Sequence, residues 1–277
     1  MTATVLEQEA GALLARASTE NFPVALRLLS RGQRRHLMAI YGFARLADEL
    51  GDEAPGDRLA QLDWLEADLD RAYAGAALHP LLQRLAPTLR ELALPRQPFA
   101  DLIDANRRDQ LVTRYATWDD LRGYCILSAN PVGRLVLLVF GVSTPERIAL
   151  SDEVCTALQL AEHCQDVRED LERGRIYLPA EDLQRFAVDE PALRADRASP
   201  ELRALLRFEV ARARSLFDGG AALVRTLSGR ARLAVGGFVA GGRAALDAIE
   251  RCDFDVLATH ARPRVRDVLH RLVEVVF

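Results

Sequence analysis

The sequence predicts an all-α protein folded as one domain over residues 1–277. Apolar residues recur at spacings of three and four almost throughout, and the alternation typical of strands is nearly absent. Aromatic residues make up only 6% of the chain, so alanine, leucine and valine must fill the core. Of these, alanine and leucine favour helices.

Proline and glycine mark breaks between the periodic segments, as at Pro55-Gly56, Pro131, Gly174 and Pro200. The segment 179–199 is expected to be a long irregular surface connection rather than a domain boundary. The predicted helices, in chain order, cover residues 4–17, 32–53, 57–74, 79–92, 97–110, 118–128, 131–141, 146–173, 200–227, 230–251 and 262–276.

Composition excludes several kinds of function. The net charge of −4 argues against a nucleic-acid partner. All 36 basic residues are arginine, which excludes a lysine nucleophile, a Schiff base and a P-loop lysine. The four cysteines form no CxxC pair and are expected to be reduced thiols. The protein is therefore expected in the cytoplasm.

No segment reads as a membrane anchor. The amino terminus carries Glu7 and Glu9 and lacks the pattern of a signal peptide. The longest strongly apolar run, Leu135–Val142, is far shorter than the roughly 20 residues of a spanning helix. Peripheral contact at the inner membrane face stays open.

The first acidic cluster is Asp48-Glu-Leu-Gly-Asp52-Glu53, near the end of a predicted helix. At about 100° per residue, Asp48 and Asp52 lie one turn apart on one face. Tyr41 and Arg45 precede them on the same stripe.

The second acidic cluster repeats this spacing with Asp166 and Asp170. Gln159 and His163 lie behind them on their own stripe, and Glu162 is one turn before Asp166. Like charges four residues apart destabilise a helix, so two matched pairs call for an explanation. Carboxylates on two helices suit Mg²⁺, which proteins hold through a few carboxylates and substrate phosphates. A solvated charged face is the alternative for either cluster alone.

Basic and aromatic residues follow the second cluster in the run Arg173-Gly174-Arg175-Ile176-Tyr177. Arginine beside such a cluster can bind diphosphate oxygens in bidentate fashion. We expect Arg45, Arg173, Arg175 and Tyr177 to hold a diphosphate from the flank.

FARLADELGDE followed by QLAEHCQDVREDLERGRIYLP resembles the two aspartate-rich motifs of the squalene and phytoene synthase family. The likeness runs from about Asn21 to Leu183 and is loose beyond residue 200. It implies a class I isoprenoid-synthase-like helical bundle with a central cavity. Members bind prenyl diphosphates through magnesium, ionise them, and form or rearrange a cyclopropylcarbinyl diphosphate. The implied metal ligands are Asp48, Asp52, Glu162, Asp166 and Asp170.

Three stretches, ENFPVA around Phe22, SANPVGRLV and AEHCQDV, resemble the hydroxysqualene synthase branch. That branch converts presqualene diphosphate to hydroxysqualene. Tyr124 stands where the family has a tyrosine, and the small residues of the family's next stretch correspond to positions from Ser128 to Gly133. The resemblance thus places Phe22, Tyr124, Ser128 and Gly133 at the substrate. A terminal tyrosine, arginine and lysine common in the synthases are not evident, which puts binding of two diphosphates in doubt.

Ionisation of presqualene diphosphate gives a carbocation, and the product depends on which groups contact that cation. We predict that no reduced nicotinamide is required and that Asn130, Glu162 or His163 positions a capturing water, since buried polar groups need partners. Asn130 could instead cap the helix opening at Pro131, and His163 could be a core histidine. Transfer of the oily substrate and product to or from neighbouring pathway enzymes is expected. The alternatives are a condensing squalene or phytoene synthase and a non-catalytic helical scaffold.

Overall fold

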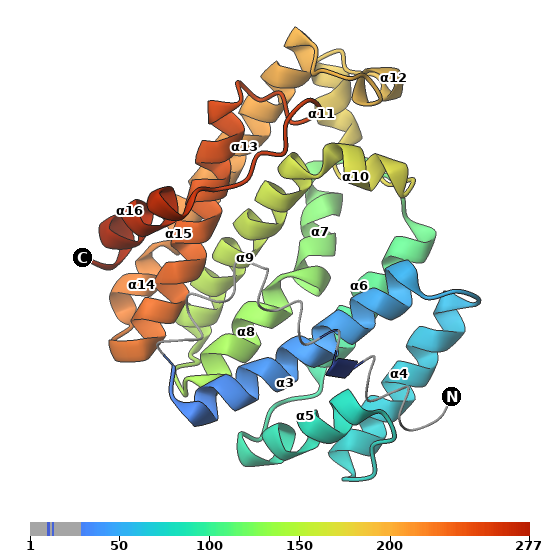
Figure 1. Cartoon of the computed structure of the whole chain (residues 1–277), viewed down its shortest axis with the longest axis vertical. Helices are drawn as coiled ribbons and strands as arrows, with labels where there is room; N and C mark the ends of the chain where they lie inside the picture. The colour runs from blue at the N-terminus through green and yellow to red at the C-terminus, as the bar shows by residue number, and fades with distance from the viewer. Residues whose placement is uncertain (1–9, 12, 14–28) are drawn as a thin grey trace. The chain divides into compact units, whose positions relative to one another are not determined.

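The computed structural model describes residues 10, 11, 13 and 29–277 (Figure 1). Most of the predicted helix 4–17, and Phe22, lie outside the described residues. In the described part of the chain every regular element is a helix, and strand-like pairing is limited to a single bridge between Arg114 and Ile176. The all-α prediction is confirmed.

The helices fall close to the predicted ranges. In chain order they are α3 (Arg31–Asp48), the π-helix η1 (Glu49–Glu53), α4 (Arg58–Tyr73), α5 (Pro80–Glu91), α6 (Gln97–Leu111), α7 (Trp118–Ser128), α8 (Asn130–Val139), α9 (Pro145–Gln165), α10 (Val167–Glu172), α11 (Ala180–Arg185), α12 (Glu190–Leu193), α13 (Pro200–Gly220), α14 (Ala222–Thr226), α15 (Gly229–Arg251) and α16 (Val265–Val276).

Local capping explains several of these starts. The Ser30 hydroxyl accepts from the backbone of Gln33, whose side chain accepts in return from the Ser30 backbone, and Thr117 and Asp120 form the same capping box. The side chain of Ser199 accepts from Leu202 N at the start of α13.

Three predicted helices are not continuous α-helices. The segment 146–173 breaks at Asp166, whose φ of −102° and ψ of 21° are not helical, and the segment 200–227 breaks at Ala221. The segment 32–53 changes from α to π geometry after Asp48. Apolar periodicity did not predict these breaks. A π-turn or one non-helical residue shifts the following residues only slightly, so the spacing of apolar residues is nearly unchanged.

The prediction of an irregular connection over 179–199 is also wrong in part. It contains α11 and α12, and α12 begins at a recognisable signal. Asp189 caps α12 by accepting from Ala192 N, and Pro191 occupies the first turn. The backbone N–H groups of Ala180 and Glu181 donate to the carbonyls of Tyr115 and Ala116 instead of lying free.

Backbone contacts group the chain into two compact units. Unit 1 comprises the residues up to Leu111 together with Pro131–Thr144, and unit 2 comprises Val112–Asn130 with Pro145–Phe277. The single domain over 1–277 stays a prediction. In unit 1, α3 and α4 each pack against α5 and α6. The rings of Phe43 and Phe99 meet edge to face there, with centroids 5.1 Å apart.

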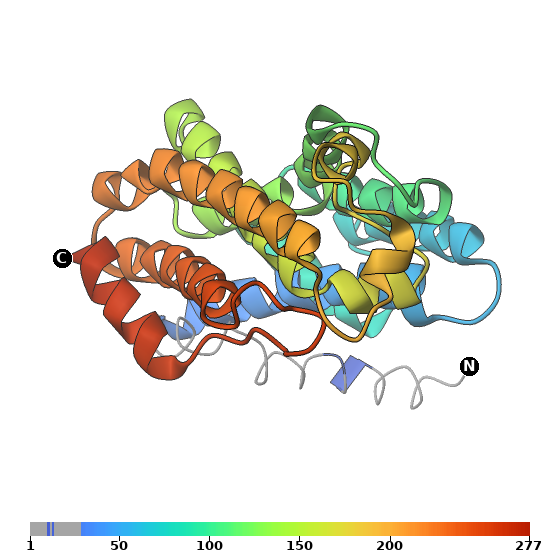
Figure 2. The ribbon, with the colours of Figure 1, turned by 90° about the horizontal axis from the view of Figure 1, so that it is seen from above.

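In unit 2, α9 packs along α13 and α15, and α16 lies beside α15 (Figures 1 and 2). Gly220 and Gly242 allow this closeness, because a Cβ at Gly220 would lie 2.6 Å from Val154 and one at Gly242 would overlap Phe217. The lack of a side chain at these two positions therefore lets the helices of unit 2 pack closely. No helix in the described ranges is long and apolar enough to cross a membrane.

Candidate functional site

The first acidic cluster lies where α3 widens into a π-helical turn. Asp48 is the last residue of α3, and Asp52 belongs to η1, which ends with Ala54 N donating to Glu49 O at 2.8 Å. Isolated π-turns occur frequently at functional sites. Gly51 is buried against Asn106, and a Cβ at this position would overlap the Asn106 side-chain oxygen.

Neutral and cationic donors surround Asp48. The Asn106 amide donates to Asp48 Oδ1 at 3.4 Å, and Arg45 Nη1 lies 3.5 Å from Asp48 Oδ2. Tyr41, one turn before Arg45, is buried. The structure therefore places Arg45 beside Asp48, on the stripe that the two residues share. Gln110 adds a bond from its amide to Gly51 O at 2.9 Å.

An open hollow of about 440 Å³ lies beside this cluster in unit 1. Residues 54–59 and Gln110 line it, and neither Asp48 nor Asp52 does. The paired carboxylates of the first cluster therefore do not face this hollow, and we assign it no role.

The second acidic cluster is more crowded with like charge. Asp166 sits at the break between α9 and α10, and its carbonyl accepts from Asp170 N at 2.8 Å. Loss of water around the carboxyl group and the negative charges of Glu169 and Asp170 raise the pKa of Asp166 to about 7, although the residue as a whole is exposed. A cation would relieve this repulsion.

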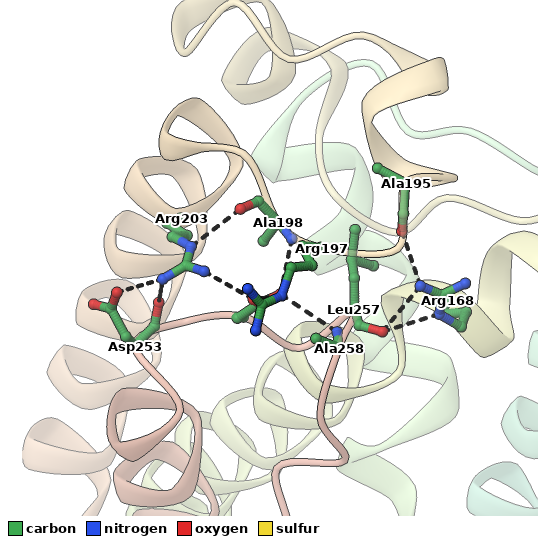
Figure 3. A network of polar contacts seen from close by, with 9 residues as sticks. Arg168, Ala195, Arg197, Ala198, Arg203, Asp253, Leu257 and Ala258 are labelled. Atoms are coloured by element: carbon green, nitrogen blue, oxygen red, sulfur yellow. Dashed lines mark hydrogen bonds and ion pairs between the residues drawn. The ribbon is translucent and has the colours of Figure 1, made fainter.

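Arg168, inside the second cluster, bonds to backbone carbonyls and holds α10 in place. Its guanidinium donates to the carbonyls of Leu257, at 2.9 and 3.2 Å, and of Ala195, at 2.8 Å (Figure 3). Gln165 also donates to the Ala261 carbonyl. The break in the helix is therefore fixed by bonds to two distant loops.

Those two loops are tied to each other by Asp255, which is buried. Its Oδ1 accepts from Ala198 N at 2.8 Å, and its Oδ2 accepts from Arg203 at 2.8 Å. Arg203 also pairs with Asp253 (Figure 3). Sequence reasoning did not identify this support, since nothing in the local pattern links position 168 to position 255.

An aromatic group lies beside the second cluster. The His163 ring stacks on Tyr177 with centroids 4.0 Å apart and planes 12° from parallel, and Tyr124 and Tyr115 pack around Tyr177. His163 Nδ1 is 3.9 Å from Asp170 Oδ2, and its Nε2 is 3.4 Å from the Gln159 amide. Five predicted site residues of unit 2 therefore meet here: Tyr124, Gln159, His163, Asp170 and Tyr177.

A small cavity of about 10 Å³ opens within this group. Its polar walls are His163, Asp170 and Tyr177, and the remaining walls are apolar, from Val167, Ile176, Leu178 and Leu193. That volume is about the minimum for one water molecule, and such a water would have polar partners.

The other two candidates for positioning water lie elsewhere. The buried Asn130 begins α8, and its Oδ1 accepts from Thr156 Oγ1 at 3.1 Å. Thr156 precedes His163 by seven residues on α9, about 10 Å along the axis. Glu162 is exposed on α9. The described contacts thus bring neither residue to the small cavity.

Two further predicted residues lie on α7 and α8. Ser128 ends α7, and its buried hydroxyl makes no hydrogen bond within the described residues. Gly133 lies in the first turn of α8 and is half-buried.

The segment after the second cluster is clamped in an extended path. Gly174 has a φ of +82°, which suits glycine, and its carbonyl accepts from Arg114 at 2.7 Å. Ile176 N donates to Thr113 O at 2.9 Å. The segment buries Arg175 and leaves Arg173 exposed, so the two arginines expected to act together have different surroundings. No sequence motif includes Arg114, so sequence reasoning did not identify its part in holding this segment.

The donor set of each cluster fits a hard divalent cation, since it consists of carboxylates. In the part of the chain that the structure describes, no three acidic, histidine or cysteine side chains converge as a ready metal site. Each cluster by itself is therefore suited to share a metal with substrate oxygens rather than to enclose one.

An all-helical chain with two paired-aspartate clusters and arginines beside them has the groups to bind diphosphate esters together with a divalent cation. Residues 15–268 match the family model for squalene/phytoene synthase, and the chain belongs to that family.

Relatives in this family have different products. The chain is 34% identical over 260 residues to 15-cis-phytoene synthase of Synechococcus elongatus, covering 87% of this chain and 83% of that protein. It is 36% identical over 211 residues to hydroxysqualene synthase of Sinorhizobium fredii, covering 74% and 70%.

The crystal structure of squalene synthase HpnC from Alicyclobacillus acidocaldarius superposes with a TM-score of 0.82 at 43% identity, covering 92% of this chain and 97% of that one. A dehydrosqualene synthase structure, at 23% identity and a TM-score of 0.84, supports the fold alone. The predicted isoprenoid-synthase-like fold class is confirmed.

Proposed function

We propose that this protein is a hydroxysqualene synthase, which ionises presqualene diphosphate and captures the cation with water. The observation that carries the proposal is the cavity lined by His163, Asp170 and Tyr177, with room for about one water beside the second acidic cluster. The hydroxysqualene synthase among the relatives supports the same choice.

In the reaction, the bond between the primary carbon and the diphosphate oxygen breaks, and the diphosphate leaves with the electron pair. The resulting cyclopropylcarbinyl cation rearranges, and the water oxygen bonds to a ring carbon while a ring carbon–carbon bond breaks and its electrons form a double bond. The water then releases a proton, so the products are hydroxysqualene and diphosphate. Asp48, Asp52, Asp166 and Asp170, with Glu162, would hold magnesium. Bound magnesium would neutralise the negative charge that develops on the leaving diphosphate.

The chain's own residues do the remaining work. Arg45 and the buried Arg175 donate hydrogen bonds to diphosphate oxygens, and Arg173 adds a positive charge from the surface. The rings of Tyr124 and Tyr177 give the cation an electron-rich wall. His163, held by stacking on Tyr177, orients the water and receives its proton. Phe22, Tyr41, Ser128, Gly133 and Gln159 are proposed to shape the substrate pocket, and Asn130 remains an alternative water-positioning residue.

The second candidate is a condensing enzyme that joins two prenyl diphosphates. The phytoene synthases among the relatives favour it. It requires no cavity for water, whereas the proposed function requires one and needs no nicotinamide. Both candidates handle lipids, so we propose a cytoplasmic protein in peripheral contact with the inner membrane face, exchanging substrate and product with neighbouring pathway enzymes.

Product analysis in oxygen-18 water distinguishes the candidates. Purified protein with magnesium receives either presqualene diphosphate or farnesyl diphosphate, without nicotinamide. We expect hydroxysqualene carrying one oxygen-18 from presqualene diphosphate. Unlabelled alcohol, or squalene formed only on addition of a nicotinamide, would move the protein to the condensing class.

A His163→Phe variant sharpens the test, because it keeps a ring against Tyr177 and removes both nitrogens. We expect it to lose most of the labelled alcohol while still releasing diphosphate. The comparison variants Asn130→Gly and Glu162→Asn are expected to keep the alcohol as the main product. If Asn130→Gly alone lost it, the water would belong to Asn130.

A further inference from the structure

The carboxyl-terminal helix α16 presents an apolar stripe to solvent. Val265, Leu269, Val273 and Phe277 recur every fourth residue, and their exposed fractions are 74%, 51%, 59% and 92%. At 100° per residue they cover an arc of about 120°. Four large apolar side chains in one line differ from the scattered exposed residues of an ordinary surface.

The other side of α16 is firmly held, so the direction of the stripe is fixed. Val276 and Leu272 lie against Gly236 of α15. Arg271 donates to both oxygens of Asp247 at 2.8 and 2.9 Å. Arg251 pairs with Asp267 at 3.0 Å. The apolar arc of α16 is therefore wider than its contact with α15, and the excess faces outward.

Positive charge borders the stripe. Arg262 and Arg264, in the segment leading into α16, are exposed and have no ion pair within the described residues. Arg266, which follows Val265, pairs with Asp267 at 3.4 Å, and its side chain is 73% exposed. The acidic residues of α16 are already paired, Asp267 with Arg251 and Glu274 with Arg271.

We propose that α16 docks this protein on a bilayer with anionic headgroups, with the stripe in the lipid and the arginines at the phosphates. An amphipathic helix with basic flanks lies in the membrane interface in this way. The choice of a lipid over a protein partner rests on the proposed function, in which substrate and product are lipids.

The segment before α16 also contacts the second acidic cluster. Arg168 donates to Leu257 O, Gln165 donates to Ala261 O, and His260 Nδ1 lies 3.4 Å from Glu169 Oε1. The membrane-docking helix therefore continues directly from the loop that fixes the diphosphate-binding motif.

Vesicle flotation tests the proposal with the full chain. Vesicles of phosphatidylcholine alone, or with a quarter phosphatidylglycerol, are mixed with the wild type, with Leu269→Asp/Val273→Asp, or with the matched control Leu78→Asp/Leu111→Asp, which alters two exposed leucines in unit 1. We expect the wild type and the control to float with anionic vesicles, and the α16 variant to bind at least tenfold less. Arg262→Gln/Arg264→Gln should bind severalfold less than the wild type at low salt.

Absence of wild-type flotation, or equal flotation of the α16 variant, overturns the proposal. Loss of a dimer in the α16 variant, measured by ultracentrifugation without any flotation, would assign the stripe to a second copy of the chain instead. Turnover of presqualene diphosphate in detergent micelles separates the two proposals. The α16 variant should match the wild type there, and a protein that floats without making hydroxysqualene contradicts the proposed function alone.

Discussion

The two acidic clusters share a spacing but are built differently. In unit 1 the chain widens into a π-turn after Asp48, and the Asn106 amide and the Arg45 guanidinium lie 3.4 and 3.5 Å from the Asp48 carboxylate. In unit 2 the helix breaks at Asp166, and the nearest charges are two further carboxylates. The same four-residue spacing thus arises on two backbones, and neither is a regular α-helix throughout.

The difference indicates a division of labour. Asp48 of the first cluster has an amide and a guanidinium beside it, whereas Asp166 of the second has two carboxylates acting on it, and a cation would relieve that repulsion. We therefore expect the second cluster to depend more strongly on magnesium.

The largest expected effect is the loss of activity when one aspartate of either cluster is replaced by asparagine. Asp166→Asn should lower kcat by about a hundredfold or more, because charge stabilisation of a leaving group is a large catalytic contribution. Asp52→Asn should lower it too, but with a smaller change in the magnesium concentration that gives half-maximal rate. Steady-state rates against magnesium measure both. Near-normal rates in both variants would contradict the assignment of these carboxylates.

The second prediction breaks the π-turn of the first cluster. Gly51→Ala would place a methyl group onto the Asn106 side chain, so we expect about 1–3 kcal/mol of destabilisation and roughly tenfold lower activity. Gly237→Ala is the matched control, since nothing lies within 4 Å of its Cβ position, and it should be neutral or stabilising. Urea unfolding measures the change in stability of each variant, and turnover measures the change in its activity. The double variant Gly51→Ala/Asn106→Ala should recover part of both losses, and no recovery would mean that the turn itself excludes alanine.

The third prediction loosens the second cluster without touching a carboxylate. Arg168→Met keeps the stem and removes the bonds to Leu257 and Ala195, so we expect severalfold lower kcat/KM. Arg168→Lys should recover part of it, as one ammonium reaches a carbonyl. Arg194→Met, which removes an exposed arginine paired with Glu190, is the control. If Arg168→Met lowered stability alone and left kcat/KM unchanged, Arg168 would support the fold and not the motif.

Much of this organisation follows from the sequence. Apolar periodicity predicted the helices, and their spacing put Arg45 and Asp48 on one stripe. The breaks were missed because they depend on distant partners: Asp166 leaves helical geometry where Arg168 reaches loops some 30 and 90 positions away. The meeting of His163 with Tyr177 was also beyond prediction, since the positive φ of Gly174 turns the chain back between them. Local patterns specify elements, and the site depends on long-range bonds.

The smallest expected effect concerns the charge of the second cluster in metal-free protein. The pKa of Asp166, about 7, lies above the ordinary value of 3.8, so the folded state binds a proton that the unfolded state has lost. Stability from this group is complete below about pH 4 and is lost as the pH rises through 7. Allowing for solvent screening of an exposed group, the loss is about 1 kcal/mol, or roughly 2–4 °C in Tm. In EDTA, the wild type should therefore fall below Asp166→Asn by this margin between pH 5 and 8, and added magnesium should close the gap. Parallel melting curves for the two proteins across that pH range would show that the second cluster is already neutralised, and the contrast with the first would disappear.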